Sequence, residues 1–376
     1  MTPLEELELL LRPAGGGIHL VSTGRAEQEA LQQRLYGAST ADDVRAKWTA
    51  TLAKIAAARV VILGVPSDVG AGFRRGANLA PAAIRTAILA EDSDWPARSA
   101  AAGVIDIGDV FVVPQLLHDD MLSDAQKAAS RRALYPTAPA SVVATLPVSP
   151  LSIEERALDL VFALNPNVAP VVIGGDHSTA WPVAAALSRV RRARSEPWGI
   201  VQPDAHTDLL EERLGVRYCF ATWSFHANDL VGRGGRMVQV GIRATRFPRE
   251  HWETTLGVRQ FWADECRDRP AQALDAIVEH LKNTGVKGIY FSNDIDGTDD
   301  SWADATGTPE PNGLTPDFVV ELIRRLGRDI GIIAGDVMEV APPLESRPGG
   351  SVKTVALAAR YLRETIDAIL ARPQGV

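Results

Sequence analysis

The sequence predicts an α/β protein, a three-layer αβα sandwich around a mainly parallel sheet. Two observations lead to this prediction. From Arg59 onwards, apolar segments of strand length alternate with longer helical segments, which is typical of parallel sheets. These strand segments are also apolar throughout, which indicates that helices cover both faces of the sheet. With 376 residues, 46% of them hydrophobic, the chain can form one large core.

The expected elements follow in order. Residues 1–58 are interpreted as a helical N-terminal extension, in which Ser39 and Thr40 could cap a helix that runs to about Ala58. The expected strands are Arg59–Val65, Val104–Ile107, Ala169–Ile173, Trp198–Gln202, Arg236–Ile242, Gly288–Phe291 and Gly331–Ala334. The expected helices are Leu151–Leu164, Ala180–Val190, Pro270–Thr284, Pro316–Leu326 and Val352–Ala371.

Two local patterns complete this reading. Ser152 and Glu155 have the spacing of a capping box at the start of the first of these helices. The segment Gln115–Pro150 is rich in Ala, Pro and Ser, and we expect a long, partly disordered surface excursion there.

Composition restricts partners and location. The net charge of −8 and a pI near 5.5 disfavour nucleic acid and anionic membranes as partners and suit small cations. Cys219 and Cys266 lie far apart in the sequence and form no disulfide framework, so a reducing compartment is expected. The start MTPLEELELL lacks the positive charge of a signal peptide, and no apolar run approaches the roughly 20 residues of a membrane span. We therefore expect a cytoplasmic protein.

Three expected strands end in acidic or histidine clusters. The clusters read Gly174-Gly175-Asp176-His177-Ser178, Asp204-Ala205-His206-Thr207-Asp208 and Asp294-Ile295-Asp296-Gly297. Functional groups of parallel sheets gather at the carboxyl ends of strands. Residues two apart in extended chain point to the same side, so each of the last two clusters offers neighbouring ligands.

The combined set predicts a binuclear metal site. It contains four carboxylates and two imidazoles, from His177, Asp204, His206, Asp208, Asp294 and Asp296. Six ligands are too many for one tetrahedral zinc and suit two divalent ions. Four acids in one pocket would also repel one another without cations. A single cluster of this kind is usually a turn or a cap, but three in order favour a shared metal site.

These motifs resemble those of the ureohydrolase superfamily, which includes arginase, agmatinase and formiminoglutamase. The resemblance extends over about residues 59–370. It also includes Gly64-Val65-Pro66-Ser67-Asp68, Ala305-Thr306-Gly307-Thr308-Pro309 and Asp336-Val337-Met338-Glu339-Val340. It implies an arginase-like fold, with residues 59–376 as the catalytic domain, and a homo-oligomer, either a trimer or a hexamer.

The resemblance also implies residue roles. One metal would bind His177, Asp204, Asp208 and Asp294, the other would bind Asp204, His206, Asp294 and Asp296, and Asp204 and Asp294 would bridge the two. The ions would be Mn²⁺ or Ni²⁺. Glu339 matches the family glutamate that pairs with the guanidinium group of the substrate, and a carboxylate suits that planar cation. Thr308 resembles the residue that supports this glutamate, and Asp296 is a plausible proton carrier to the leaving nitrogen.

The sequence departs from the family pattern near the expected substrate. Tyr218 stands where relatives usually carry a histidine, and His226 follows eight residues later. Asp300 replaces a usual proline, and Trp302 lies in a loop expected to border the pocket. With the long N-terminal extension, these departures resemble the nickel-dependent guanidine hydrolases. They predict that Tyr218 or His226 takes the histidine's place and that Trp302 contacts a small substrate.

The predicted function is hydrolysis of a guanidino C–N bond to give urea plus ammonia or an amine, with free guanidine as the leading substrate. An agmatinase or guanidinobutyrase is the alternative. A catalytically silent partner subunit would not need the intact set of six ligands. A deacetylase-like hydrolase with a single zinc would not need His206 and Asp296.

Overall fold

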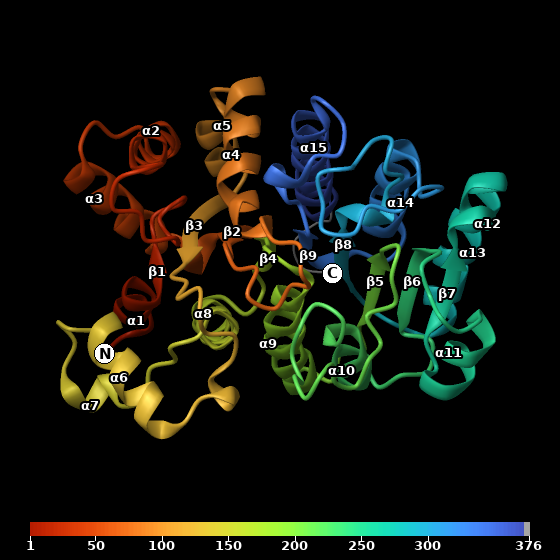
Figure 1. Ribbon diagram of the computed structural model, residues 1–376, viewed down its shortest axis with the longest axis horizontal. Helices are drawn as coiled ribbons and strands as arrows, with labels where there is room; N and C mark the ends of the chain where they lie inside the picture. Colours follow the sequence, from red (N-terminus) through yellow and green to blue (C-terminus); the bar gives the residue numbers. More distant parts are fainter. Residues whose placement is uncertain (372–376) are drawn as a thin grey trace.

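The computed structural model describes residues 1–371 and contains one nine-stranded sheet (Figure 1). The strand order is β1-β3-β2-β4-β9-β8-β5-β6-β7. The strands are β1 Leu11–Arg12, β2 Val60–Gly64, β3 Val104–Val110, β4 Ala169–Ile173, β5 Gly199–Pro203, β6 Met237–Ile242, β7 Arg259–Trp262, β8 Ile289–Asp294 and β9 Ile332–Met338. Strands β2 to β9 pair in parallel and β1 pairs antiparallel with β3, so the predicted fold class is confirmed.

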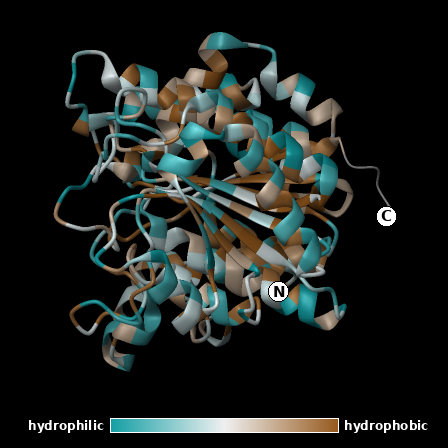
Figure 2. Cartoon of the chain, turned by 90° about the vertical axis from the view of Figure 1, so that its right-hand side faces the viewer, coloured by the Kyte–Doolittle hydropathy of each residue, from teal (hydrophilic) through white to brown (hydrophobic). Residues whose placement is uncertain are grey.

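Helices cover both faces of this sheet (Figure 1), and the residues of its strands are mainly hydrophobic (Figure 2). One layer contains α8 Pro150–Leu164, α9 Ala180–Ala193 and α10 Trp223–Leu230. The other contains α4 Ala80–Glu91, α13 Pro270–Asn283, α14 Pro316–Asp329 and α15 Gly350–Leu370. Val61 and Leu63 of β2 face a core shared with α8 and α9, whereas Val60 and Ile62 face the opposite core. This alternation of side chains between two apolar cores explains why strands such as β2 and β4 are apolar throughout.

The N-terminal segment is attached to the edge of the sheet. It contains α1 Pro3–Leu10, α2 Arg25–Tyr36, α3 Ala41–Leu52 and the 3₁₀ turn η1 Ile55–Ala57. Thr40 caps α3 by accepting the backbone N–H of Asp43. This helix ends at Leu52, earlier than predicted, and a separate turn follows.

The remaining helices lie mainly in the connections. They are α5 Trp95–Ala101, α6 Asp124–Leu134, α7 Ala140–Val143, α11 Arg249–Leu256 and α12 Ala263–Asp268. The predicted capping box is wrong, because α8 begins at Pro150 with Ser149 as its N-cap, and the Ser152 hydroxyl instead accepts the backbone N–H of Asp119. The excursion at 115–150 contains α6 and α7, and it packs through the buried side chains Tyr135 and Leu146.

The sheet topology places the site. Strands β4, β9, β8 and β5 are neighbours, so their carboxyl ends open at the same edge of the sheet. The order in which the chain visits these strands reverses around this point, which is where open α/β sheets form ligand crevices. None of the helices within residues 1–371 has both the length and the apolar character needed to cross a membrane.

Candidate metal centre

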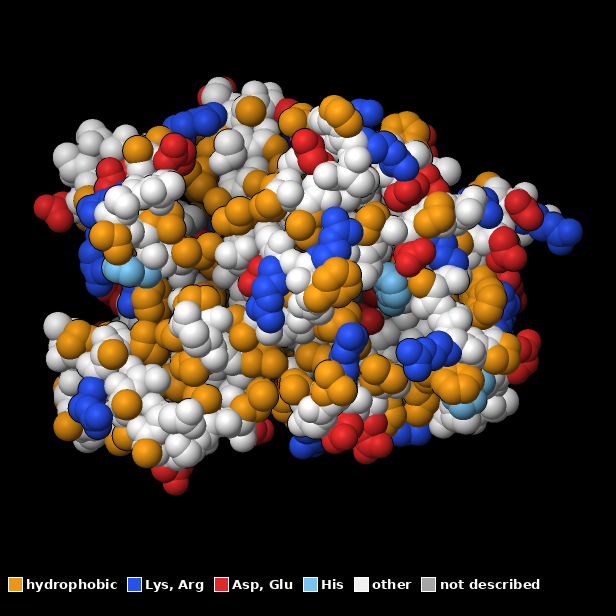
Figure 3. Space-filling model, viewed as in Figure 1, with side chains coloured by type: hydrophobic (Ala, Val, Ile, Leu, Met, Phe, Trp, Pro, Cys, Tyr) orange, Lys and Arg blue, Asp and Glu red, His pale blue; other side chains and the backbone are white. Residues whose placement is uncertain are grey.

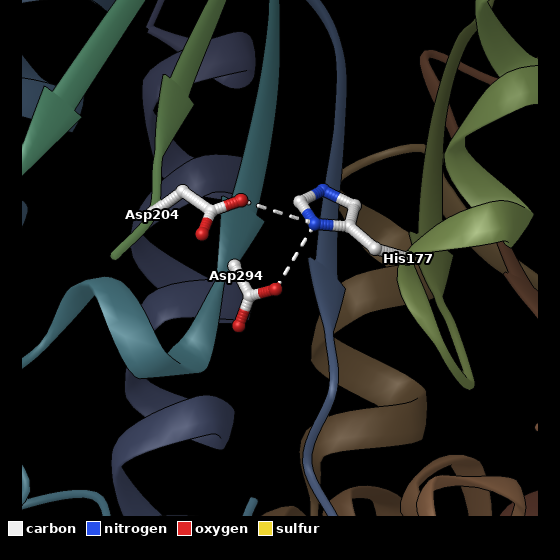
Figure 4. A group of neighbouring side chains, drawn as sticks. All are labelled: His177, Asp204 and Asp294. Carbon is white, nitrogen blue, oxygen red and sulfur yellow. Dashed lines mark ion pairs between the residues drawn. The ribbon is translucent and has the colours of Figure 1, made fainter. Parts of the chain in front are cut away.

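The three predicted clusters come together at the carboxyl ends of three central strands, β4, β5 and β8. His177 opens the 3₁₀ turn η4 His177–Thr179 after β4, Asp204 follows β5, and Asp294 ends β8. Figure 4 shows these three side chains pointing toward one another from separate elements. Gly175 makes the turn after β4 possible, because a Cβ there would clash with the carbonyl oxygen of Ser67.

The first group surrounds Nδ1 of His177. This nitrogen lies 3.0 Å from Oδ2 of Asp294 and 3.3 Å from Oδ2 of both Asp204 and Asp208. All four residues are buried. Asp208 has a positive φ of 51°, a backbone conformation that non-glycine residues adopt rarely. In this conformation its carboxylate faces Nδ1 of His177.

The second group surrounds Nδ1 of His206, which lies 3.2 Å from Oδ2 of Asp296 and 3.6 Å from Oδ1 of Asp204. Asp204 therefore belongs to both groups and presents a different oxygen to each. The His206 side chain is 27% exposed, whereas that of His177 is 1% exposed. The His177 ring is therefore closed off from solvent, whereas the His206 ring is partly open to it.

This donor set fits two divalent cations. Nδ1 of His177 is buried and has no hydrogen-bond partner among the described residues, although three carboxylates surround it. Leaving such an atom without a partner costs free energy, and a cation between the nitrogen and the oxygens would remove that cost. Among residues 1–371, His177, Asp204 and Asp294 form one candidate ligand group, and Asp204, His206 and Asp296 form another.

The protonation of these side chains also reflects crowding. Burial, followed by repulsion from Asp296 and Asp204, raises the pKa of Asp294 well above its usual value. Burial and the charge of Asp204 raise the pKa of Asp208 to about 6. Burial lowers the pKa of His206. The neighbouring carboxylates of Asp296 and Asp204 outweigh this effect and raise the pKa to about 12. Protons on these side chains thus offset the same negative charge that bound metal cations would offset.

Neighbouring side chains orient the ligands. The Trp223 indole donates to Oδ2 of Asp208 at 3.1 Å, and the Gln202 amide donates to Oδ2 of Asp204 at 2.7 Å. Nε2 of His177 lies 3.1 Å from the Ser292 hydroxyl, so Nδ1 faces the carboxylates. Such outer contacts fix the ring and carboxylate orientation of metal ligands. The sequence analysis missed these three residues, although a polar side chain within an apolar strand, as at Gln202 and Ser292, was an available signal.

Glu339 lies beside the six residues at the base of a cavity. Its Oε1 accepts the backbone N–H of His177 at 2.9 Å, and its own backbone N–H donates to Gly175. It has a positive φ of 61°. Burial, followed by repulsion from Asp176, raises the pKa of its carboxyl group. A carboxylate held in this way is available to a cation that enters the cavity.

The cavity has a volume of about 720 Å³. His206, Asp208, Thr308 and Glu339 line its inner part. Its other lining side chains are mostly apolar or cationic and include Phe73, Arg74, Leu209, Leu210, Arg213, Leu214, Phe220, Arg246, Phe247 and Trp252. The space-filling view shows a histidine and acidic side chains in a hollow, with basic and apolar side chains around it (Figure 3).

Four predicted contacts differ from this arrangement. Thr308 donates to Oδ2 of Asp296 at 2.9 Å rather than to Glu339. Tyr218 is buried and stacks on Trp181 with ring centroids 4.8 Å apart, and His226 lies 3.0 Å from the carbonyl oxygen of Glu211. Trp302 is 53% exposed. Tyr218, His226 and Trp302 do not line the cavity. The first two are buried and pack against Trp181, and the third is exposed to solvent.

The family assignment follows from comparison with known proteins. A model described as "Arginase family" matches residues 58–367. The chain belongs to the arginase family. As an arginase-family protein it is a metal-dependent amidinohydrolase, which confirms the predicted reaction class.

Individual relatives carry different names within the arginase family. The chain is 28% identical to a guanidinobutyrase of Pseudomonas aeruginosa, over 84% of this chain and 87% of the relative. It is 31% identical to the mitochondrial agmatinase of Gallus gallus, over 81% and 79%. The crystal structure of agmatine ureohydrolase of Thermoplasma volcanium superposes with a TM-score of 0.62 and 25% identity, covering 84% of this chain and 91% of that one. Arginase-family enzymes use a pair of divalent metal ions, and this chain has candidate ligand groups for them.

Proposed function

We propose that this chain hydrolyses the C–N bond of a guanidino compound and releases urea together with ammonia or an amine. The observation that carries the proposal is the position of Glu339. Its carboxylate is fixed by the backbone of His177 and lines the same cavity as His206 and Asp208. A planar guanidinium ion that pairs with this carboxylate would have its carbon next to the two ligand groups.

The six clustered side chains would hold two divalent ions in this proposal. His177, Asp204, Asp208 and Asp294 form one site, and Asp204, His206, Asp294 and Asp296 form the other. Mn²⁺ and Ni²⁺ are the candidate ions. A divalent pair, when bound, lowers the pKa of water enough to supply a nucleophile near neutral pH.

The chain's own residues would then handle the substrate and the proton. Glu339 binds and orients the guanidinium group, which brings the reacting atoms together. Asp296, whose Oδ2 accepts the Thr308 hydroxyl, takes up the proton that the attacking water releases and delivers it to the departing nitrogen. Water adds to the guanidinium carbon, the bond to the substituted nitrogen breaks, and the products are urea and a protonated amine.

The cavity supports a substrate larger than guanidine. A volume of about 720 Å³ is within the usual range for drug-sized ligands, roughly 300–1,000 Å³. Trp302, which was predicted to contact a small substrate, does not line the cavity. Arg213 and Arg246 line the outer part, and neither forms an ion pair within residues 1–371. Arg74 also lines the cavity, and Glu212 is the acid beside Arg213, so cations outnumber acids in this outer lining. This balance favours an anionic tail, as in a guanidino acid, over the cationic tail of agmatine, while free guanidine remains the candidate that the sequence predicts.

The deciding experiment is a urea-release assay with manganese- and nickel-loaded protein. The substrates are guanidine, agmatine, arginine, 3-guanidinopropionate and 4-guanidinobutyrate. We expect urea from at least one substrate with the wild type and almost none with Glu339→Gln. Protein that binds two metals but releases no urea from any of the five substrates would contradict the proposal and favour a catalytically silent subunit.

The oligomeric state and the cellular compartment of the enzyme are part of the same proposal. Arginase-family enzymes are typically oligomeric, and we infer a trimer or a hexamer. Cys219 and Cys266 are both free and buried, which supports a reducing compartment such as the cytoplasm.

A further inference from the structure

Three glutamines form a continuous row beneath the metal centre. Gln202, Gln239 and Gln260 lie on the neighbouring strands β5, β6 and β7. They are directly paired in the sheet register, Gln202 with Gln239 and Gln239 with Gln260. All three are completely buried. Paired residues on adjacent parallel strands project side by side on one face of the sheet, so the three amides are in contact.

The amides form one chain of hydrogen bonds that ends on a metal ligand. The Trp262 indole donates to Oε1 of Gln260 at 3.0 Å. The Gln260 amide donates to Oε1 of Gln239 at 2.8 Å, and the Gln239 amide donates to Oε1 of Gln202 at 2.9 Å. The Gln202 amide donates to Oδ2 of Asp204 at 2.7 Å.

The direction of the chain is fixed at both ends. An indole N–H can only donate, so Gln260 must present its oxygen to Trp262. At the other end an ionised carboxylate can only accept, so Gln202 must present its nitrogen to Asp204. Two side contacts agree with this direction: the Ser224 hydroxyl donates to Oε1 of Gln202 at 2.7 Å, and the Gln239 amide also donates to the carbonyl oxygen of Thr207 at 2.5 Å. Every amide dipole therefore points the same way.

Packing alone does not explain this row. The strand neighbours Val201, Val238 and Phe261 are apolar and buried, and apolar side chains at the three positions would need no hydrogen-bond partners. A chain of aligned amides in a low-dielectric interior polarises its members cooperatively. Its effect is concentrated on the atom at its end, Oδ2 of Asp204.

Asp204 is the carboxylate that both ligand groups share. Its Oδ2 faces His177 and its Oδ1 faces His206. We propose that the chain Trp262–Gln260–Gln239–Gln202 positions and polarises the Asp204 carboxylate, and so influences the metal affinity of the centre from as far away as Trp262 on β7. The three glutamines are positioning residues. This inference rests on the proposed metal site but not on the identity of the substrate.

The first test removes the last link. Gln202→Met keeps the approximate volume and deletes the donor to Asp204. We expect the affinity for Mn²⁺, measured by competition with a fluorescent chelator, to fall by roughly 10- to 100-fold, as for other outer contacts of metal ligands. Unchanged affinity in this variant would overturn the proposal. Wild-type protein that binds no Mn²⁺ would instead contradict the metal site itself.

The second test measures whether a change at the far end of the glutamine row also alters the Mn²⁺ affinity. Gln260→Met alters a side chain that contacts Trp262 and Gln239 but not Asp204. We expect a smaller loss of Mn²⁺ affinity, roughly two- to fivefold, and no further loss when Gln202 is already Met. Equal losses in both backgrounds, or none in either, would show that Gln260 does not act through Gln202.

A spectroscopic readout and a matched control separate positioning from general destabilisation. The visible absorption of cobalt-substituted protein reports the ligand field, and it should change in both glutamine variants. Asn228→Leu removes a buried amide that donates to the carbonyl oxygen of Leu256, outside the row, and should leave the spectrum unchanged. If Gln260→Met fails to fold, Trp262→Phe removes the outermost donor, and an unchanged spectrum there would also overturn the proposal.

Discussion

The two halves of the metal centre differ in their surroundings although they share Asp204. The His177 half is enclosed by Trp223, whose indole bonds Asp208, and by Ser292, which bonds the imidazole. The His206 half faces the cavity, and its histidine is partly exposed. The difference indicates a division of labour. We expect the enclosed half to fix geometry and the open half to meet substrate and water.

The largest expected effect on metal binding and activity comes from replacing Asp204, the carboxylate that both halves share. Asp204→Asn changes a side chain that belongs to both ligand groups, so we expect both metals to bind weakly. Urea release should fall by about 1,000-fold or more, because the nucleophile depends on the metals. Elemental analysis and the urea assay measure the two losses. A variant with two tightly bound metals would contradict the shared role of Asp204.

The next prediction separates substrate binding from metal binding. Glu339→Gln should keep both metals, because Glu339 belongs to neither ligand group, and should weaken transition-state stabilisation by about 2–5 kcal/mol through loss of a buried charge pair. Kinetics and metal analysis on the same preparation measure this. Loss of metal from this variant would place Glu339 in the centre itself.

The difference between the halves predicts unequal histidine variants. His206→Asn leaves the His177 group intact, so we expect about one metal per chain and a melting temperature close to that of the wild type. His177→Asn removes a fully buried ring that packs against Trp223 with centroids 4.6 Å apart, so the melting temperature should also fall. Equal stoichiometry and equal melting temperatures in the two variants would remove the distinction between the halves.

A buried acid near the enclosed half predicts a pH dependence of stability. Burial, followed by repulsion from Asp336, raises the pKa of Glu154 well above its usual value, and neither of its carboxyl oxygens has a hydrogen-bond partner in the described part of the chain. The folded protein therefore keeps a proton that the unfolded chain releases above about pH 4.3. As a result, the contribution of Glu154 to stability is lost as the pH rises, by roughly 1.4 kcal/mol per pH unit until its folded pKa is reached.

Glu154→Gln should remove this dependence. Urea unfolding at pH 5 and pH 8 should show the variant gaining stability on the wild type at the higher pH. Glu155→Gln is the control, because Glu155 pairs with Arg189 near the surface. The same pH trend in both variants would exclude Glu154 as its source.

The smallest effects are expected where the sequence predicted large ones. Trp302→Ala should leave the ranking of substrates unchanged, because the indole points away from the cavity. Tyr218→Phe keeps the stacking on Trp181 and should change kcat by less than about threefold, as expected for a residue that does not touch the reacting groups. A large change in substrate preference in either variant would restore the predicted contact.

The sequence predicted those features that depend on local pattern. Strands such as Ala169–Ile173 are buried on both faces, so their composition alone marks them. The candidate ligands directly follow the ends of parallel strands, and those ends meet at one edge of the sheet. The spacing of two contributed less than expected, because Asp296 lies in the 3₁₀ turn η5 Ile295–Gly297 and not in extended chain. Strand β7 was missed because it has four residues and includes Arg259 and Gln260, and β1 because it has only two residues.

Contacts that depend on how loops turn were beyond the sequence. Whether Tyr218 faced the cavity or the core depended on the path of residues 209–222, which no short-range pattern fixes. The glutamine row required the register of three strands, and each of its members alone was only a polar residue within a strand.

The short strand β1 has a consequence for the edge of the sheet. Leu7, Leu10 and Leu11 lie in the same core as Ile107 and Leu158, and the buried carboxylate of Asp109 accepts the backbone N–H of Gly15 at 2.7 Å while pairing with Arg85. A chain without this segment would expose a strand edge and apolar surface together. The N-terminal residues are therefore an integral part of the hydrophobic core and not an appendage on its surface.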